Sequence, residues 1–252
     1  MPETAMITGA TAGIGHAFAT ELARKGHDLV IVARDTERLK AVAKQLADKH
    51  GVDVRTRTAD LSTTAGIKRA AKDLDDPSRP IGILVNNAGF ALRKPFADNP
   101  IADEEAVLNV MVRAPMHLTH AAINAMQGRR RGKIVNVSSV SAFTPRGTYG
   151  AHKAWIVSFS RWANIAYADQ GIRVMALCPG FVRTEFHQRM NARTDNIPNW
   201  MWLDADELVR RGLADLDRGA AVSIPTLRYK ALATLSRLTP PRLVARIAKL
   251  GR

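Results

Sequence analysis

A hydroxyl pair, a phenol and an ammonium lie close together in one stretch of the chain, at Ser138, Ser139, Tyr149 and Lys153. Tyr149 and Lys153 are four residues apart, and the apolar positions that follow repeat at helical spacing, so both side chains should share one helical face. A free tyrosine has a pKa of about 10, and a cation nearby stabilises the phenolate and lowers that pKa. The spacing therefore predicts that Tyr149 is a general acid and base assisted by Lys153.

A glycine-rich loop, residues 8–15, stands between the first apolar run and the first predicted helix. Its glycines, Gly9, Gly13 and Gly15, permit a tight turn and a close approach of the backbone to a pyrophosphate. The helix that follows would direct unpaired N–H groups and the positive end of its dipole at the phosphates. This loop predicts a dinucleotide-binding site.

The end of the second apolar run, 29–33, bears on which dinucleotide binds. A carboxylate at the end of that strand would bind the ribose 2′-OH of NAD, whereas a 2′-phosphate needs a cation. Ala33 holds the acidic position and Arg34 follows it, with Arg38 one helical turn further. A guanidinium can bind a phosphate through two hydrogen bonds. We expect NADP(H), with NAD(H) as the alternative if Asp35 takes the carboxylate role.

Several sequence motifs each occur once, and in their order the chain resembles the classical short-chain dehydrogenase/reductase family. They are the loop Thr8-Gly9-Ala10-Thr11-Ala12-Gly13-Ile14-Gly15, the motif Asn86-Asn87-Ala88-Gly89, Asn109, the Ser139 to Lys153 stretch, and Pro179-Gly180-Phe181-Val182-Arg183-Thr184. The resemblance covers residues 4–184. One departure is the separation of ten residues between Ser139 and Tyr149, which is a few residues shorter than is usual in that family.

The resemblance implies a catalytic set of Asn109, Ser139, Tyr149 and Lys153. Ser139 would hydrogen-bond the reacting oxygen, with Ser138 and Ser141 as rivals for this role, and Asn109 would hold a water in a proton relay to Lys153. The implied cofactor site comprises Gly9, Thr11, Gly13, Ile14, Gly15, Arg34, Arg38, Asp60, Leu61, Asn87, Ala88, Gly89, Tyr149, Lys153, Pro179, Gly180, Val182 and Thr184. Asp60 would meet the adenine amino group, although it could also be an ordinary helix cap. No metal site is expected.

Short apolar runs alternate with helical patterns along most of the chain, which is typical of βαβ units. The strands expected are 5–8, 28–33, 52–56, 83–85, 133–137 and 173–177, and the helices 15–25, 37–49, 65–74, 102–126, 149–169 and 204–216. Because the runs are continuously apolar, the sheet should be parallel and covered on both faces. We predict a single α/β domain with a Rossmann-like doubly wound sheet of about seven strands.

The net charge of +14 attracts anions in general and names no single partner. The single Cys178 excludes an intramolecular disulfide and suits a reducing compartment. The first apolar run breaks at Gly9, which leaves no signal peptide, and no run approaches the roughly 20 apolar residues of a membrane span. We expect a cytoplasmic protein that does not bind nucleic acid.

Apolar side chains gather in segments that surround the substrate in the family. They are Phe90, Leu92, Phe143, Phe186, Trp200, Met201 and Trp202. With residues 184–218 as a substrate-covering lid, they predict an apolar carbonyl or alcohol substrate; the alternative is a lid packed on itself or on a partner subunit. The long helices 102–126 and 149–169 resemble those that form dimers and tetramers in the family, so a homodimer or homotetramer is expected.

The segment 220–252 combines an apolar stripe with a basic face. The leucines of 227–238 recur at helical spacing, and Arg242, Arg246, Lys249 and Arg252 share one face of a further helix. This pattern is that of a helix at an anionic membrane surface, or of one docked on the protein or on a neighbouring subunit. For the whole chain, the alternative to an oxidoreductase is a non-catalytic dinucleotide-binding module with a regulatory or nucleic-acid-associated role.

Overall fold

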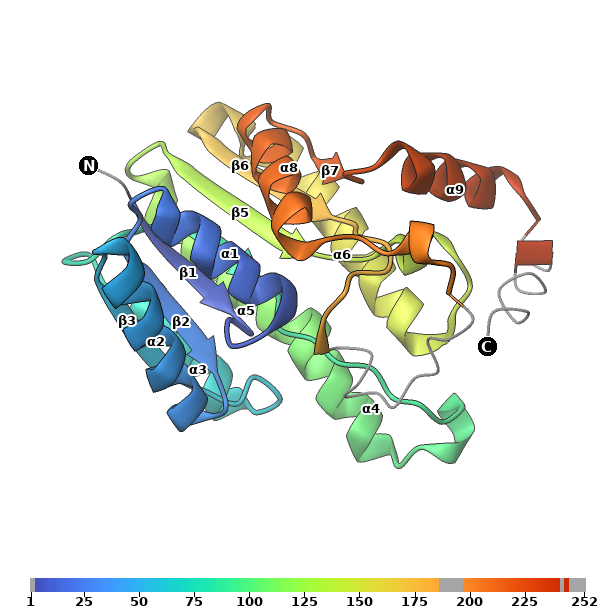
Figure 1. Cartoon of the computed structure of the whole chain (residues 1–252), viewed down its shortest axis with the longest axis horizontal. Coiled ribbons are helices and arrows are strands. Elements are labelled where there is room, and N and C mark those ends of the chain that lie inside the picture. The colour runs from blue at the N-terminus through green and yellow to red at the C-terminus, as the bar shows by residue number, and fades with distance from the viewer. Residues whose placement is uncertain (1–2, 186–196, 241–242, 245–252) are drawn as a thin grey trace.

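The computed structural model describes residues 3–185, 197–240 and 243–244. A seven-stranded parallel sheet runs through the molecule in the order β3-β2-β1-β4-β5-β6-β7 (Figure 1). Its strands are β1 Thr4–Thr8, β2 Leu29–Ala33, β3 Val54–Thr58, β4 Ile81–Asn86, β5 Gly132–Val137, β6 Ile172–Leu177 and β7 Val222–Ser223. The predicted Rossmann-like doubly wound sheet in a single domain is confirmed.

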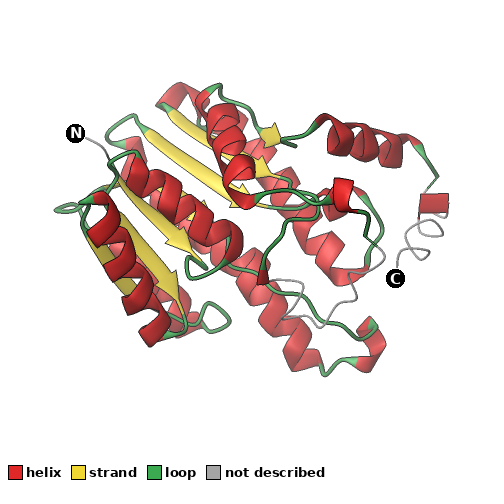
Figure 2. Ribbon diagram, viewed as in Figure 1, coloured by secondary structure: helices red, strands yellow, loops and turns green. Residues whose placement is uncertain are grey.

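Helices cover both faces of the sheet, as Figure 2 shows. On one face lie α1 Gly13–Arg24, α2 Thr36–His50 and α8 Ala205–Asp217. On the other lie α3 Thr64–Leu74, α5 Ala114–Gln127 and α6 Gly147–Ala166, with α4 Ile101–Leu108 running into α5. Short 3₁₀ turns occur at Phe96–Asp98, Val140–Phe143, Ala168–Gln170 and Asn199–Met201, and α9 Leu227–Leu238 projects from the edge of the domain.

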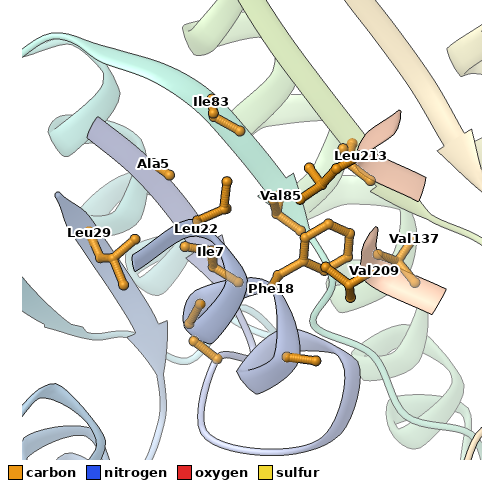
Figure 3. Close-up of a cluster of buried hydrophobic side chains, with 14 of the residues drawn as sticks. Ala5, Ile7, Phe18, Leu22, Leu29, Ile83, Val85, Val137, Val209 and Leu213 are labelled. Carbon is orange, nitrogen blue, oxygen red and sulfur yellow. The ribbon is translucent and has the colours of Figure 1, made fainter. Parts of the chain in front are cut away.

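The core divides into two apolar layers because each strand alternates its side chains between the two faces. Figure 3 shows the first layer, in which Phe18 and Leu22 of α1 meet Val85 and Val137 of the sheet and Leu213 of α8. All five are at least 94% buried. This packing holds the start of α1 against the sheet, and the glycine-rich loop with it.

The long helix expected over 102–126 is interrupted by a π-helical turn at Asn109–Arg113. The turn is closed by a hydrogen bond from the Ala114 N–H to the Asn109 carbonyl, five residues back. Such turns within a helix occur frequently at functional sites. Asn109, a candidate catalytic residue, is the first residue of this turn.

One further difference from the expected elements concerns the C-terminal part. Strand β7 has only two residues, Val222 and Ser223, which pair with Ala176 and Leu177 at the edge of the sheet. So short a strand has no periodicity that a sequence pattern could reveal. In the described part of the chain, no helix is both long and apolar enough to cross a bilayer.

Candidate active site

The carboxyl ends of the central strands meet along one edge of the sheet. The chain winds outward from β1 through β2 to β3 and then crosses to β4 on the other side of β1. At such a reversal the loops leave the sheet in opposite directions and open a crevice for a ligand. The glycine loop after β1, Asn87 after β4 and Ser138 after β5 all lie at this edge.

The glycine loop adopts the conformation that a phosphate cradle requires. Gly9 and Gly13 have φ angles of 66° and 55°, a region that L side chains rarely adopt. A Cβ at Gly15 would lie 2.2 Å from the Gly9 carbonyl oxygen, so this position also excludes a side chain. The first turn of α1 receives no hydrogen bond from an N-cap side chain. These features fit a dinucleotide pyrophosphate at the start of α1.

Thr8 and Asn87 tie the glycine loop to the neighbouring strand. The Thr8 hydroxyl accepts hydrogen bonds from the N–H groups of Asn87 at 2.9 Å and Ala88 at 3.1 Å. The Asn87 side-chain amide donates to the carbonyl oxygens of Thr8 and Gly9 at 3.0 and 3.2 Å. Two loops that both border the crevice are therefore held in one register. Thr11 and Ile14 remain partly exposed in the loop, where Ile14 also packs on the core.

Tyr149 and Ser139 are brought together by α6 and the end of β5. A hydrogen bond joins the Ser139 hydroxyl to the Tyr149 phenol and favours the phenolate, lowering the Tyr149 pKa against the opposing effect of burial. The rival Ser138 is engaged elsewhere, because its hydroxyl donates to the Lys153 carbonyl oxygen at 2.7 Å. Of the two adjacent serines, Ser139 is therefore the one aimed at the phenol. Ser141 supplies a backbone N–H that donates to Ser139 Oγ at 3.1 Å.

Lys153 lies close to Tyr149 and is only 5% exposed. Its ammonium donates to the Val137 carbonyl oxygen at 2.7 Å and sits 5.7 Å from the centre of the Tyr149 ring. Burial lowers the pKa of Lys153 to about 8. A Cβ at Gly89 would lie 3.7 Å from the Lys153 nitrogen, so this glycine leaves open the space beside the ammonium.

The expectation that Lys153 lowers the Tyr149 pKa is wrong. Tyr149 keeps some surface exposed, but the protein around it is dense, and burial raises its pKa to about 12. Only the Ser139 hydrogen bond opposes this effect. The cation is directed at the Val137 carbonyl and lies over the ring, so desolvation of the phenolate outweighs its attraction.

Asn109 begins the π-helical turn, and its side-chain amide donates to the Ser62 carbonyl oxygen at 2.9 Å. This bond ties the helix to the loop that follows β3. A mid-helix asparagine is thus explained by a structural contact, and the relay of a water to Lys153 stays a prediction.

The same loop contains the two residues expected near the adenine. The Asp60 carboxylate accepts hydrogen bonds from the N–H and hydroxyl of Ser62, while the cap of α3 is Thr63. The Leu61 side chain is 5% exposed and belongs to the core. Only the backbone of Leu61 can therefore line a cofactor site.

The end of β2 presents charged side chains. Arg34 is exposed, and the Asp35 carboxylate is the N-cap of α2, accepting from the Arg38 N–H at 3.0 Å. The Arg38 guanidinium, expected as a second phosphate ligand, instead donates to the carboxylate of Glu185 in an ion pair. Asp35 is thus occupied as a cap, and Arg38 already has an anionic partner.

The segment 179–184 crosses from β6 toward the glycine loop. Val182 forms a parallel bridge with Leu203, and the Thr184 Cβ would be 3.0 Å from a Cβ placed on Gly13. Gly180 is required by packing, because a Cβ there would lie 1.9 Å from the ring of Tyr229 in α9. The Tyr229 hydroxyl accepts from the Phe181 N–H and donates to the Met201 carbonyl.

The apolar side chains expected around a substrate are only partly gathered. Phe181 and Trp202 pack with ring centres 5.9 Å apart, whereas Trp200 is 59% exposed. Phe90 and Phe143 each pack against a different apolar cluster. Phe186 lies outside the described residues. A cavity of about 410 Å³ between the start of α8 and the start of α9 does not include Tyr149 or Ser139.

Four residues that matter to this geometry act through contacts that no sequence pattern reveals. Asn136 accepts from the Asn86 amide at 2.8 Å and donates to the Ser160 hydroxyl at 3.0 Å, which links β4, β5 and α6 below the site. Ser138, Tyr229 and Glu185 likewise act through partners far away in the sequence. Polar residues at such positions carry no periodic pattern, so only the fold reveals their partners.

The chain is similar to proteins of known class. A family model for short chain dehydrogenases matches residues 3–195. The human inactive hydroxysteroid dehydrogenase-like protein 1 is 34% identical over 208 residues, covering 79% of this chain. The chain spans about 60% of the length of that relative. Rat 17-beta-hydroxysteroid dehydrogenase type 3 is 31% identical over 96% of this chain and 78% of its own.

A solved structure extends the likeness to the fold. The short-chain dehydrogenase from Sphingobium yanoikuyae in complex with NADPH has a TM-score of 0.85 and 37% identity, and 93% of each chain is covered. The parallel sheet, the glycine loop at its edge and the family match over residues 3–195 agree with one another. This chain belongs to the short-chain dehydrogenase family.

Proposed function

We propose that the protein is an NADP(H)-dependent oxidoreductase that transfers hydride between the nicotinamide and a carbonyl or secondary alcohol. The observation that carries this proposal is the Ser139–Tyr149 hydrogen bond beside the buried Lys153 ammonium. These groups lie at the sheet edge that also bears the glycine loop. A module that only binds a dinucleotide has no need of all three groups.

In this mechanism the nicotinamide, when bound, supplies or accepts the hydride. Tyr149, with a pKa of about 12, is protonated at neutral pH and donates its proton to the oxyanion that develops on the carbonyl oxygen. Ser139 hydrogen-bonds the same oxygen and steadies the charge. Lys153 is cationic below its pKa of about 8 and stabilises the phenolate that remains. Asn109 holds the helix against the loop after β3.

We assign the 2′-phosphate of NADP(H) to Arg34, which is exposed at the end of β2. Asp35 is engaged as the cap of α2, which leaves it poorly placed to bind a ribose hydroxyl. The NADPH complex of the Sphingobium relative supports this choice. Asn87, Ala88 and Gly89 would line the groove between the adenosine and the nicotinamide, and Thr184 would meet the carboxamide.

The substrate is an apolar ketone or alcohol in this proposal. The Phe181–Trp202 pair and the exposed Trp200 border the segment 179–184 and supply an apolar rim. The resemblance to a 17-beta-hydroxysteroid dehydrogenase agrees with a lipid-like substrate. We retain the segment 184–218 as the substrate-covering region, of which residues 186–196 lie outside the described residues.

The test is NADPH oxidation with a panel of ketones and aldehydes, followed at 340 nm, with Tyr149→Phe as the matched control. Substrate-dependent turnover that is lost in Tyr149→Phe would support the proposal. The name of the human relative makes the alternative, an inactive dinucleotide-binding module, a real competitor. NADPH binding without turnover of any compound in both proteins would favour that module.

A homo-oligomer is part of the proposal. Helix α6 carries an aromatic row in which Trp155 stacks on Phe159 at 4.8 Å and Phe159 meets Trp162 at 5.9 Å. Trp162 and Ile165 remain 55% and 79% exposed. Apolar side chains in such number on one surface are typical of an interface between subunits. Light scattering at micromolar concentration should give a dimer or tetramer; a monomer would contradict this.

The C-terminal segment is proposed to bring this otherwise cytoplasmic enzyme to anionic membranes. Helix α9 docks through Tyr229 and Ala233, while Leu227, Leu235 and Leu238 are 83%, 62% and 80% exposed. Docking on the protein's own core therefore does not use these leucines. Residues 226–252 contain seven arginines and lysines and no acidic residue, so two copies of the segment would repel each other and an anionic surface would attract it. The basic face expected from the sequence, at Arg242, Arg246, Lys249 and Arg252, lies outside the described residues.

Vesicle co-sedimentation tests this contact. The full-length protein should bind vesicles with phosphatidylserine more strongly than vesicles of phosphatidylcholine alone, and Leu235→Glu with Leu238→Glu should abolish the binding. Thr234→Glu, an exposed position on the same helix, is the matched control for added charge. Equal and negligible binding to both vesicle types would overturn the proposed contact.

A further inference from the structure

Arg38 and Glu185 are 147 residues apart in sequence and form an ion pair. The Arg38 guanidinium donates to a Glu185 carboxylate oxygen, and the side chains are 38% and 42% exposed. The hydrogen bond that Arg38 donates to Glu185 is the largest of the effects that raise the pKa of Arg38. This contact connects the start of α2 with the residue that follows Thr184.

The pair lies close to the glycine loop. Arg38 stands in the first turn of α2, which follows β2 directly. Thr184 is packed close to Gly13 at the start of α1, and the next residue, Glu185, pairs with Arg38. The Glu185 carboxylate is therefore already paired with Arg38, a cation that the 2′-phosphate of a bound NADP(H) would otherwise contact.

The charges around Arg38 make the competition electrostatic. Asp35 also faces Arg38, although its carboxylate is held by the Arg38 backbone N–H. The charge of Arg34 acts on Asp60, in the loop that follows β3. A 2′-phosphate brought beside Arg38 thus meets Glu185 directly, and a carboxylate both engages the guanidinium and repels a phosphate.

We propose that Glu185 determines cofactor preference by competing with the 2′-phosphate for Arg38. This inference rests on the proposed use of NADP(H). Glu185 weakens the binding of NADP(H) and leaves the binding of NAD(H) unchanged. It therefore reduces the preference of the protein for NADP(H) over NAD(H). Because the ion pair is well exposed to solvent, the effect is modest, about two- to fivefold in affinity, and salt reduces it.

The experiment compares Glu185→Gln with the unmutated protein by titration calorimetry. The probes are adenosine 2′,5′-bisphosphate, which carries the 2′-phosphate, and 5′-AMP, which does not. Glu185→Gln should bind the bisphosphate and NADPH about two- to fivefold more tightly and leave 5′-AMP and NADH unchanged. The gain should shrink in 0.5 M NaCl, where the Debye length falls to about 4 Å, and also in an Arg38→Gln background.

Glu37→Gln is the matched control, because Glu37 precedes Arg38 on the same helix but pairs with Lys40 at 2.8 Å. It should change neither affinity. Weaker bisphosphate binding in Glu185→Gln would mean that Glu185 positions Arg38 for the phosphate, and an equal gain for 5′-AMP would mean a general effect on the groove; either result overturns the inference. Unchanged binding overturns it as well. A wild-type protein that binds neither NADPH nor NADH would instead overturn the proposed function.

Glu185→Ala provides a second variant with the same expected gain, in case Glu185→Gln does not fold. Thermal melting of both variants without ligand should stay within a few degrees of the wild type, because a solvent-exposed ion pair contributes little to stability.

Discussion

The two ends of the proposed cofactor groove differ in how deeply their polar and charged side chains are buried. At the catalytic end, Ser139 and Lys153 are 9% and 5% exposed, and each has a defined hydrogen-bond partner. At the other end, the side chains of Arg38 and Glu185 are about 40% exposed and form an ion pair with each other. Desolvation controls the pKa values at the first end, whereas screened Coulomb interactions govern the second.

This difference predicts where mutations act strongly. A buried group cannot exchange its partner for water. Removing the group therefore leaves its partner with an unpaired charge or an unsatisfied hydrogen bond. An exposed charge can turn to solvent, and its loss costs less. The predictions below test this contrast from the largest effect to the smallest.

Tyr149→Phe should reduce turnover by about 10²- to 10⁴-fold, the range for loss of a general acid. The substitution removes only the hydroxyl, so the dissociation constant for NADPH should stay nearly unchanged. Steady-state kinetics and a fluorescence titration of NADPH give the two values. Comparable turnover in the variant would show that the phenol is not the proton donor.

Lys153→Met should remove turnover, weaken NADPH binding and change how stability depends on pH. The Lys153 pKa is about 8 in the folded protein, below its value of 10.5 when unfolded. Between those values the unfolded chain holds the proton and the folded protein has lost it, so the free energy of unfolding rises with pH, by up to about 3 kcal/mol.

Tyr149 acts in the opposite sense above pH 10, because its folded pKa is about 12 against 10.0 when unfolded. The rise due to Lys153 should therefore be seen between about pH 8 and pH 10 in urea unfolding of the unmutated protein. Lys153→Met should lack it. A rise of the same size in the variant would assign the effect to other groups.

Arg34→Ala should weaken NADPH binding by about 1 to 3 kcal/mol, the scale for losing a hydrogen bond to a charged group. Binding of NADH should barely change. The ratio of the two dissociation constants measures the preference. If the unmutated protein already prefers NADH, the assignment of Arg34 to the 2′-phosphate is wrong.

Asp35→Ala separates a helix cap from a cofactor ligand. Loss of the N-cap should lower the free energy of unfolding by about 1 kcal/mol and leave the affinity for NADH unchanged. Chemical denaturation and NADH titration give the two quantities. A large loss of NADH affinity would make Asp35 the ribose ligand.

Much of the fold could be predicted because strong local patterns coincide with the global architecture. The continuous apolar runs of β1, β2 and β6 and the glycine loop each have one structural solution. The expected strand ends differ by one or two residues at β3 and β4, where polar residues such as Arg57 and Asn86 continue the strand. Alternation alone does not show that such side chains have partners.

The site was harder to predict where long-range contacts decide it. The spacing of Tyr149 and Lys153 placed both on α6, but the direction of the Tyr149 pKa shift depends on how densely the surroundings exclude water. The Arg38 partner lies on a segment 147 residues away. Neither quantity is encoded in local spacing, so only the assembled structure supplies it.

Tyr229 gives the C-terminal helix a mechanical role. Its ring fills the space that Gly180 leaves open, and its hydroxyl bonds both Phe181 and Met201. A displacement of α9 would therefore be transmitted through the Tyr229 ring to the segment 179–184. If a bilayer holds α9, adsorption and catalysis become coupled events, and the enzyme would display interfacial activation: turnover that changes when vesicles are added, even with a water-soluble substrate.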